Sequence, residues 1–422
     1  MVTREKNVSR VSRNRNVAPK QTKAKSFFMN PKQSFMQWFD NYFLHQSRAF
    51  YLMVMLILFI VGLGLVVVFS ASHVSAIKSS GNPFSDLIVQ TAWAVIGLVL
   101  MVFISNRSVE QIEHFGRRGF WLFLGLQCLV VVPGIGRSSG GNSNWIGIGN
   151  ISLGQPSEFL KLTMIIMLAS NLAPFADRLD DFKRGPAQFI SWGVLTAGVV
   201  VGTGKDMGTA LVMVLTLIGI LYLIGFPRNW WWRLVGIVGV LGFALVQISD
   251  SRKARFGEFI TRWINPGNVS LDGLGWQTEH GFWGLAFGGV TGNGLGQSKL
   301  DWGWIPEIQN DFIFANIGEE MGMLGAITVI FLFFALGKYI LRIANLNQDP
   351  FVHIVSIGIM VWILLQAYIN IAVVVGLGPV LGVPLPLISK GGSSLVAVLM
   401  ALGVVLAFER NTVAVPSRIK SR

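Results

Sequence analysis

Residues 306–320 read PEIQNDFIFANIGEE and lead from a polar loop into a long apolar run. Asp311 lies where this run begins, and Glu319 and Glu320 lie inside it. Acidic side chains are rare in segments that cross a bilayer, and those that occur usually face a cavity and have a function. The stretch therefore indicates chemistry, or transport, at a membrane surface.

The composition is that of a polytopic membrane protein. Of the 422 residues, 52% are hydrophobic and 13% are charged, whereas a soluble protein carries about a quarter charged residues. The sequence predicts an all-α fold with ten transmembrane helices, because ten apolar runs are long enough to cross a bilayer. The runs lie near residues 50–70, 86–105, 118–134, 157–173, 187–202, 207–225, 229–249, 312–337, 351–375 and 393–409.

The net charge of +13 is distributed according to membrane topology. Most of the 34 Lys and Arg residues fall in the N-terminal tail, in alternate short loops and at the C-terminus. Cytoplasmic segments are enriched in these residues, so we predict that both termini are cytoplasmic. The distribution also argues against nucleic acid as a partner. The large loop 250–311, between helices 7 and 8, then faces outward with Asp311.

This topology divides the chain into three parts. Residues 1–49 form a basic cytoplasmic tail, residues 50–409 the membrane domain, and residues 410–422 a cytoplasmic C-terminal tail. In the first tail, apolar residues recur near helical spacing, which indicates either an interfacial helix or a plain linker; they are Phe35, Met36, Phe39, Phe43 and Leu44. The loop 250–311 is rich in aromatic residues, so we expect short helices in it that roof a cavity.

A charged motif opens the fourth run, where Gln155, Pro156 and Ser157 precede Glu158 and Lys161. Glu158 and Lys161 are three residues apart and share one helix face. They form either a local ion pair at a helix start or the charged lining of a polar cavity. We favour the cavity because both charges lie within a membrane segment.

Three further segments have structural alternatives. Lys205 and Asp206 follow a glycine, but the segment lacks the spacing and the preceding strand of a phosphate-binding loop, so Asp206 is predicted to cap a helix. Residues 384–394, PLPLISKGGSS, form either a bent segment that lines the protein interior or a plain connector. Asp311 could also be only a helix cap.

These motifs, in this order and spacing, resemble the signature of the SEDS proteins, the FtsW/RodA family, over residues 50–410. The matching segments are Asn144-Trp145-Ile146, Gln155-Pro156-Ser157-Glu158 with Lys161, Asp206 with Gly208-Thr209, Gly294-Leu295-Gly296, Pro306-Glu307 with Asp311-Phe312-Ile313-Phe314-Ala315, Gly318-Glu319-Glu320, Gln366-Ala367 with Asn370-Ile371, and Gly391-Gly392-Ser393-Ser394. Three positions depart from the family pattern: Asn144 replaces a usual Arg or Lys, Lys205 a usual Pro, and Lys390 a usual Tyr or Asp.

The resemblance implies peptidoglycan glycosyltransfer, in which lipid II is polymerised into glycan strands outside the cytoplasmic membrane. It implies a class B penicillin-binding protein as partner, together with other divisome membrane proteins. The long loop looks most like that of actinobacterial FtsW, the septal branch, which places the protein at the division septum. The family's essential aspartate maps onto Asp311, and its polar cavity onto Trp145, Glu158, Lys161 and the Ser393-Ser394 region.

The expected mechanism assigns Asp311 as the general base that takes a proton from a sugar hydroxyl. The departing pyrophosphate needs positive charge, for which the candidates are Lys161, Lys205, Lys390, Arg262 or a divalent cation, Mg²⁺ or Mn²⁺. Asp206, Ser393 and Ser394 are further substrate-binding candidates, whereas Glu319 and Glu320 are structural or line the cavity. The alternatives are a lipid II flippase, a RodA-like elongation polymerase and a non-catalytic scaffold for a transpeptidase.

Overall fold

The computed structural model describes residues 46–419 except 140–141, 149–150, 266–273, 303–304 and 306. The predicted interfacial helix near residues 35–44 lies outside the described residues. Ten long helices each overlap one of the ten predicted runs. They are α2 (Arg48–Ser80), α3 (Ser85–Ser105), α4 (Val109–Leu129), α5 (Pro156–Leu172), α6 (Pro186–Gly204), α7 (Met207–Leu223), α8 (Arg228–Gln247), α11 (Ile313–Leu346), α12 (Pro350–Val374) and α13 (Gly392–Ile419).

Eight helical segments in the described part of the chain are long and apolar enough to cross a membrane. The two exceptions among the ten helices are α7, which has 17 residues, and α4. Helix α4 begins well before the predicted residue 118, because Ser108 and Gln111 form a capping box at its start. The multi-pass helical fold is thus confirmed, while the count of ten spans stays a prediction.

A small antiparallel sheet corrects the expectation of a purely helical fold. Strands β1 (Gly136–Ser139), β2 (Asn142–Ile148) and β3 (Ile151–Gly154) pair in that order. The Gly-, Ser- and Asn-rich composition of this segment is typical of a loop, and no apolar run of spanning length occurs there. Its strands are short and adjacent in the chain, so pairing costs little loop-closure entropy.

The long segment after α8 contains helices, as expected. They are α9 (Asp250–Ile264), α10 (Leu274–Gly288) and the short 3₁₀ helix η3 (Leu300–Trp302). Helix α10 packs closely on α11, since a Cβ atom added at Gly288 would lie 1.9 Å from the carbonyl oxygen of Gly318.

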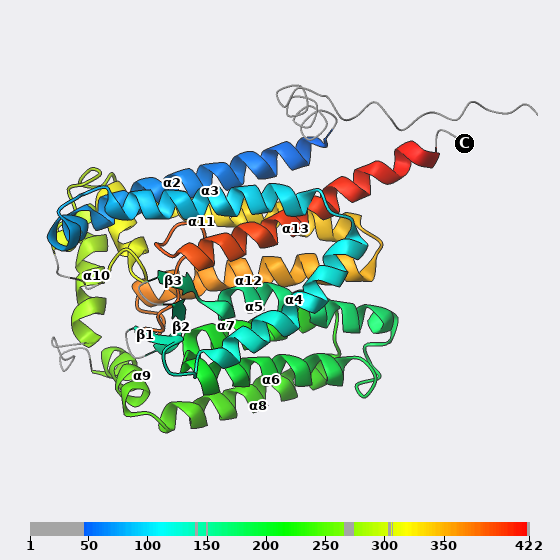
Figure 1. The fold of residues 1–422 in the computed structure, drawn as a ribbon. Helices are drawn as coiled ribbons and strands as arrows, with labels where there is room; N and C mark the ends of the chain where they lie inside the picture. Colours follow the sequence, from blue (N-terminus) through cyan, green and yellow to red (C-terminus); the bar gives the residue numbers. More distant parts are fainter. Residues whose placement is uncertain are drawn as a thin grey trace, which may run out of the picture. The chain divides into compact units, whose positions relative to one another are not determined.

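The described helices have two distinct ends (Figure 1). Helices α9 and α10 and the three strands lie at one end, and α13 ends at the opposite end. Ser47, just before α2, donates a hydrogen bond to Glu409 of α13, so the start of α2 lies at that opposite end too. Helix α13 continues to Ile419, past the predicted end of the span at residue 409.

Burial differs strongly among the helices. Most residues of α5 and α12 are buried, and so is most of the apolar part of α13, whereas α8 has no buried residue. The three central helices place their polar side chains inside the protein, where each needs a hydrogen-bond partner. Their partners define the site described below.

Helix α2 approaches the segment 375–391, here named the α12–α13 loop, at a glycine. A Cβ atom at Gly64 would lie 2.5 Å from the Leu387 carbonyl oxygen and 2.9 Å from the Ile388 Cα atom. Only a residue without a side chain allows the two backbones to lie this close.

We expect Gly64→Ala to destabilise the protein by about 1–3 kcal/mol, because it overpacks a contact between two backbones. Gly62→Ala, on the same helix, is the matched control: nothing lies within 4 Å of its added Cβ atom, and alanine stabilises a helix by about 0.5–1 kcal/mol relative to glycine. Thermal unfolding in detergent measures both variants. Equal midpoints for the two would contradict the close approach.

Candidate active site

The α12–α13 loop is the element on which the candidate site is built. Its backbone bends sharply, with positive φ angles at Gly376, Gly382 and Leu387. Leu385, Leu387 and Ile388 are buried. The expectation of a bent segment that lines the protein interior is therefore confirmed, and the alternative of a plain surface connector is wrong.

Two buried amide side chains of α12 fix this loop. The Gln366 Nε2 atom donates to the Pro384 carbonyl over 3.0 Å, and the Asn370 Nδ2 atom donates to the Val383 carbonyl over 2.8 Å. Asn370 also donates to the Asp311 carbonyl over 2.9 Å. Since buried carbonyl groups need partners, these amides tie the backbone of Asp311 to that of the loop.

Asp311 is not a helix cap. Helix α11 begins at Ile313, and its N-cap residue is Phe312, with no side-chain cap bond. The half-buried carboxylate of Asp311 instead lies beside the loop, because a Cβ atom at Gly382 would be 3.5 Å from its Oδ2 atom. Its carboxylate accepts no hydrogen bond from any of the residues that the structure describes.

The surroundings of Asp311 make its carboxylate more basic. The pKa of Asp311 is raised to about 6, mainly by burial and in smaller part by the negative charges of Glu307 and Asp206, while Arg255 acts in the opposite direction. A carboxylate with this pKa is mostly ionised at pH 7 and still accepts a proton readily. This combination suits a general base.

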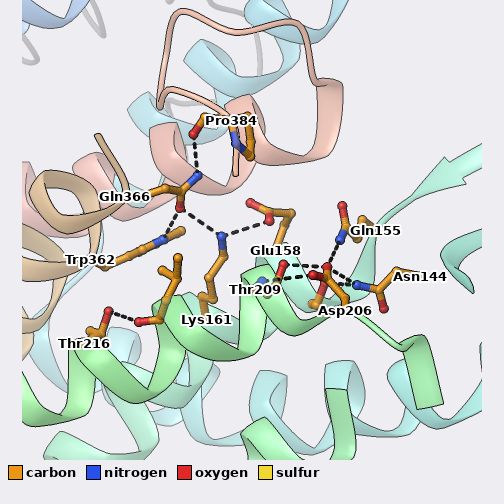
Figure 2. A network of polar contacts seen from close by, with 12 residues as sticks. Asn144, Gln155, Glu158, Lys161, Asp206, Thr209, Thr216, Trp362, Gln366 and Pro384 are labelled. Carbon is orange, nitrogen blue, oxygen red and sulfur yellow. Dashed lines mark hydrogen bonds and ion pairs between the residues drawn. The ribbon is translucent and has the colours of Figure 1, made fainter. Parts of the chain in front are cut away.

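Glu158 and Lys161 form a buried ion pair over 2.9 Å. The Lys161 ammonium also donates to the Gln366 Oε1 atom over 3.1 Å and lies 5.0 Å from the centre of the Trp362 ring. Figure 2 shows Lys161 between Glu158 and Gln366. The ion pair, the alternative to the favoured cavity lining, is thus present, and Gln366 connects it to the α12–α13 loop. The role of both charges as the lining of a polar cavity stays a prediction.

Asp206 is held by neutral groups. It caps α7, as predicted, by accepting from the Thr209 amide over 3.0 Å. Its Oδ2 atom accepts from Asn144, Gln155 and the Thr209 hydroxyl, at 2.5, 2.9 and 2.7 Å (Figure 2). Asn144 also donates to Ser157 over 3.2 Å and accepts from Gln127 over 2.8 Å. The position where the family usually has a cation therefore holds an amide that orients Asp206.

Glu319 and Glu320 lie in a separate cluster, where they fix the segment before η3. Glu319 accepts from the Ser298 hydroxyl over 2.5 Å and from the Lys299 amide over 3.0 Å. Glu320 accepts from the Ser70 hydroxyl over 2.6 Å and from the Gly296 amide over 3.0 Å. Of the two roles predicted for these glutamates, these contacts favour the structural one.

Several predicted residues lie around this centre. Pro156 opens α5, and Trp145, on β2, is half-buried. Ser393 lies against the end of β3, since a Cβ atom at Gly154 would be 3.2 Å from its Cβ atom. Ser394, one residue further along α13, is also half-buried. The substrate-binding role of these residues stays a prediction.

Two of the predicted phosphate-binding cations are already paired with carboxylates, and a third is exposed. Lys390 forms an ion pair with Asp86 over 2.8 Å. Arg262 pairs with Glu258 and with Glu279, the latter over 2.9 Å. Lys205 is exposed and ends α6 with a φ angle of 55°.

Some residues of the site had no role predicted from the sequence. Gln366 and Asn370 are polar residues four apart in an apolar helix, and this pattern predicts one buried polar face. Arg255 had no such signal, since it is one of several cations in a long loop. In the described part of the chain, no group of three or more His, Cys, Asp or Glu side chains could hold a metal ion.

We expect Glu158→Gln or Lys161→Met alone to destabilise the protein by about 3–5 kcal/mol, because each leaves one buried charge unpaired. The double variant should be more stable than either single variant. The exposed pair Asp181 and Arg184, also three residues apart, is the matched control, and Asp181→Asn should cost less than about 1 kcal/mol. Thermal unfolding in detergent measures all four. Single variants no worse than Asp181→Asn would refute the importance of the buried pair.

The chain matches a known protein family and several of its members. The family described as "Cell cycle protein", comprising FtsW, RodA and SpoVE, matches residues 50–413. Stage V sporulation protein E of Bacillus subtilis (strain 168) is 37% identical over 361 residues, which cover 85% of this chain and 96% of the relative. The probable peptidoglycan glycosyltransferase FtsW of Mycobacterium tuberculosis (strain ATCC 25618 / H37Rv) is 32% identical over 375 residues, covering 89% and 70%.

Solved structures agree with this placement. A chain from a study of how a peptidoglycan synthase complex coordinates polymerization and crosslinking matches with a TM-score of 0.67 at 25% identity, over 88% of this chain and 99% of that one. The rod shape determining protein RodA of Thermus thermophilus matches with a TM-score of 0.60 at 25% identity, over 87% and 98%. Family match, relatives and fold agree, and the chain belongs to the FtsW/RodA/SpoVE family.

Proposed function

We propose that this protein is a peptidoglycan glycosyltransferase that polymerises lipid II at the outer face of the cytoplasmic membrane. The observation that carries the proposal is the Asp311 carboxylate, which is half-buried, accepts no hydrogen bond within the described residues and lies beside the α12–α13 loop. Relatives that are 32% identical bear the name of this activity. The family membership and the site thus support the same reaction class.

In the proposed reaction, the 4-hydroxyl of the GlcNAc of one lipid II attacks the anomeric carbon at the reducing end of the growing glycan. Asp311 takes the hydroxyl proton as the new C–O bond forms. The bond between the anomeric carbon and the phosphate oxygen breaks, and the polyprenyl pyrophosphate leaves with the electron pair. The attack inverts an α-linked phosphate to a β-linked glycan, so one carboxylate suffices and no covalent intermediate is needed.

A divalent cation, Mg²⁺ or Mn²⁺, remains a candidate aid to the departing pyrophosphate. Such ions commonly bind through one or two carboxylates together with substrate phosphates. The described residues provide no group of three or more acidic, His or Cys ligands, so the phosphates would have to supply most of the ligands.

We further infer a class B penicillin-binding protein as partner. The solved complex that this chain resembles coordinates polymerization and crosslinking, and two coupled activities require a polymerase and a transpeptidase. A septal location with other divisome membrane proteins is supported by the FtsW relatives. The sporulation relative and the RodA structure leave the elongation role as the alternative. A lipid II flippase is disfavoured, because Glu319 and Glu320 hold a loop in place.

We expect Asp311→Asn to lower the rate of lipid II polymerisation by about 10²–10⁴-fold, the usual contribution of a positioned base, while the protein stays folded. Asp301→Asn is the control: burial and the nearby glutamates raise the pKa of Asp301 to about 8, so an uncharged amide replaces a mostly uncharged acid at pH 7. The assay uses purified protein with its transpeptidase partner. Normal polymer formation by folded Asp311→Asn would contradict the role of Asp311 as general base. Lipid translocation without polymer formation would favour a flippase.

The pH dependence should show the raised pKa of Asp311, which is about 6. The base acts only when ionised, so the rate should be level above that pH and fall about tenfold per unit below it. Glu307 raises the pKa of Asp311, so Glu307→Gln should move the acidic limb to lower pH. Initial rates between pH 4.5 and 8 test both statements. A fall in rate that began only near pH 3.8, the ordinary pKa of an aspartate, would contradict the raised pKa of Asp311.

A further inference from the structure

The leaving pyrophosphate needs a cation, and most of the predicted candidates are already neutralised. Lys161, Lys390 and Arg262 each form an ion pair with a carboxylate at 2.8–2.9 Å. Moving any of them onto a phosphate would leave its acidic partner without its counter-charge, which is costly for the buried Glu158. The cation that meets the substrate should therefore be one without a carboxylate partner.

Arg255 on α9 fits this description. Its Nη1 atom donates to the Val380 carbonyl over 3.1 Å. Its Nε atom is buried and has no hydrogen-bond partner within the described residues. A guanidinium group has five N–H donors in a planar fork, so this side chain retains capacity for an oxygen-rich ligand. No ion pair between Arg255 and a carboxylate occurs among the residues that the structure describes.

The α12–α13 loop brings Arg255 close to Asp311. Arg255 binds Val380, and Gly382, two residues later, packs beside the Asp311 Oδ2 atom. Two residues of extended chain span about 6–7 Å, so the guanidinium and the carboxylate lie along one short stretch of backbone. Their electrostatic interaction, which lowers the pKa of Asp311, agrees with this geometry.

The surroundings of Arg255 form a hollow at the end of the protein that holds α9 and α10. Its charged lining residues are Arg255, Glu258 and Arg262, and the remaining lining includes Phe259, Thr278 and Val380. Glu258 pairs with Arg262 there, so Arg255 is the charge of the hollow that has no ion-pair partner within the described residues, and a guanidinium group in this state favours an anion.

We propose that Arg255 binds the pyrophosphate of the lipid-linked donor beside Asp311; this rests on the function proposed above. As the bond between the sugar and the phosphate breaks, negative charge grows on the phosphate oxygen that leaves. A fixed guanidinium stabilises that charge more in the transition state than in the bound substrate. Planar guanidinium groups also bind two phosphate oxygens at once, which sets the orientation of the leaving group.

The test compares Arg255→Gln and Arg255→Lys with Arg252→Gln, the matched control. Arg252 lies three residues earlier on α9 and, within the described residues, its side chain donates to the Leu245 carbonyl. We expect Arg255→Gln to lower the polymerisation rate by about 10²–10³-fold, as loss of one donor to a developing negative charge does. Arg255→Lys should recover part of the rate, and Arg252→Gln should leave it unchanged.

Two further readouts separate phosphate binding from a purely structural role. Inhibition by added inorganic pyrophosphate should weaken in Arg255→Gln relative to wild type. The acidic limb of its pH profile should move to higher pH, because Arg255 lowers the pKa of Asp311. Thermal unfolding checks that the variant is folded.

Wild-type rates in Arg255→Gln would overturn the proposal. A loss of rate with unchanged pyrophosphate inhibition and an unchanged acidic limb would also overturn it, since the arginine would then only hold the loop. Asp311→Asn distinguishes this failure from failure of the proposed function: an inactive Asp311→Asn beside an active Arg255→Gln rejects only the role of the arginine.

Discussion

The structure depends on hydrogen bonds that satisfy the bent backbone of the α12–α13 loop. Inside a membrane protein, irregular backbone is tolerated only where protein or water meets its polar groups. Gln366 and Asn370 donate hydrogen bonds to the carbonyls of two consecutive loop residues, Pro384 and Val383. The Ser389 hydroxyl donates to the Asn310 carbonyl over 2.6 Å. These hydrogen bonds also set the position of Asp311, the residue that follows Asn310.

The loop also explains why one acid differs from the others. The carboxylates of Glu158, Asp206, Glu319 and Glu320 each accept an ion pair or hydrogen bonds. Those contacts stabilise the ionised form and fix its direction, which suits a structural group. Asp311 receives its basicity from burial and neighbouring charge and keeps its oxygens available. Among these five acids, the proposed proton transfer uses the one whose carboxylate takes least part in holding the fold.

Much of this arrangement could be predicted from the sequence. Ten apolar runs predicted ten helices, and the spacing of Glu158 and Lys161 offered their ion pair as one of two alternatives, because both features depend on local periodicity. The cap at Asp206 is likewise local. The sheet at 136–154 was missed because its strands are short and their Gly-, Ser- and Asn-rich composition is typical of loops. The partners of Lys390 and Arg262 were missed because they depend on tertiary packing, which spacing does not reveal.

The role proposed for Arg255 could not be predicted from the sequence, for the same reason. Its helix is separated from Asp311 by a long stretch of sequence, and its own neighbours include other cations without a role in the site. Its contact with the Val380 carbonyl connects it to the α12–α13 loop, beside which Asp311 lies. In the proposed mechanism, the base and the phosphate-binding cation contact the same short stretch of the loop, which sets their separation. A reaction that removes a proton at one atom while charge leaves at another benefits from such fixed geometry, because misplacement of either group lowers the rate.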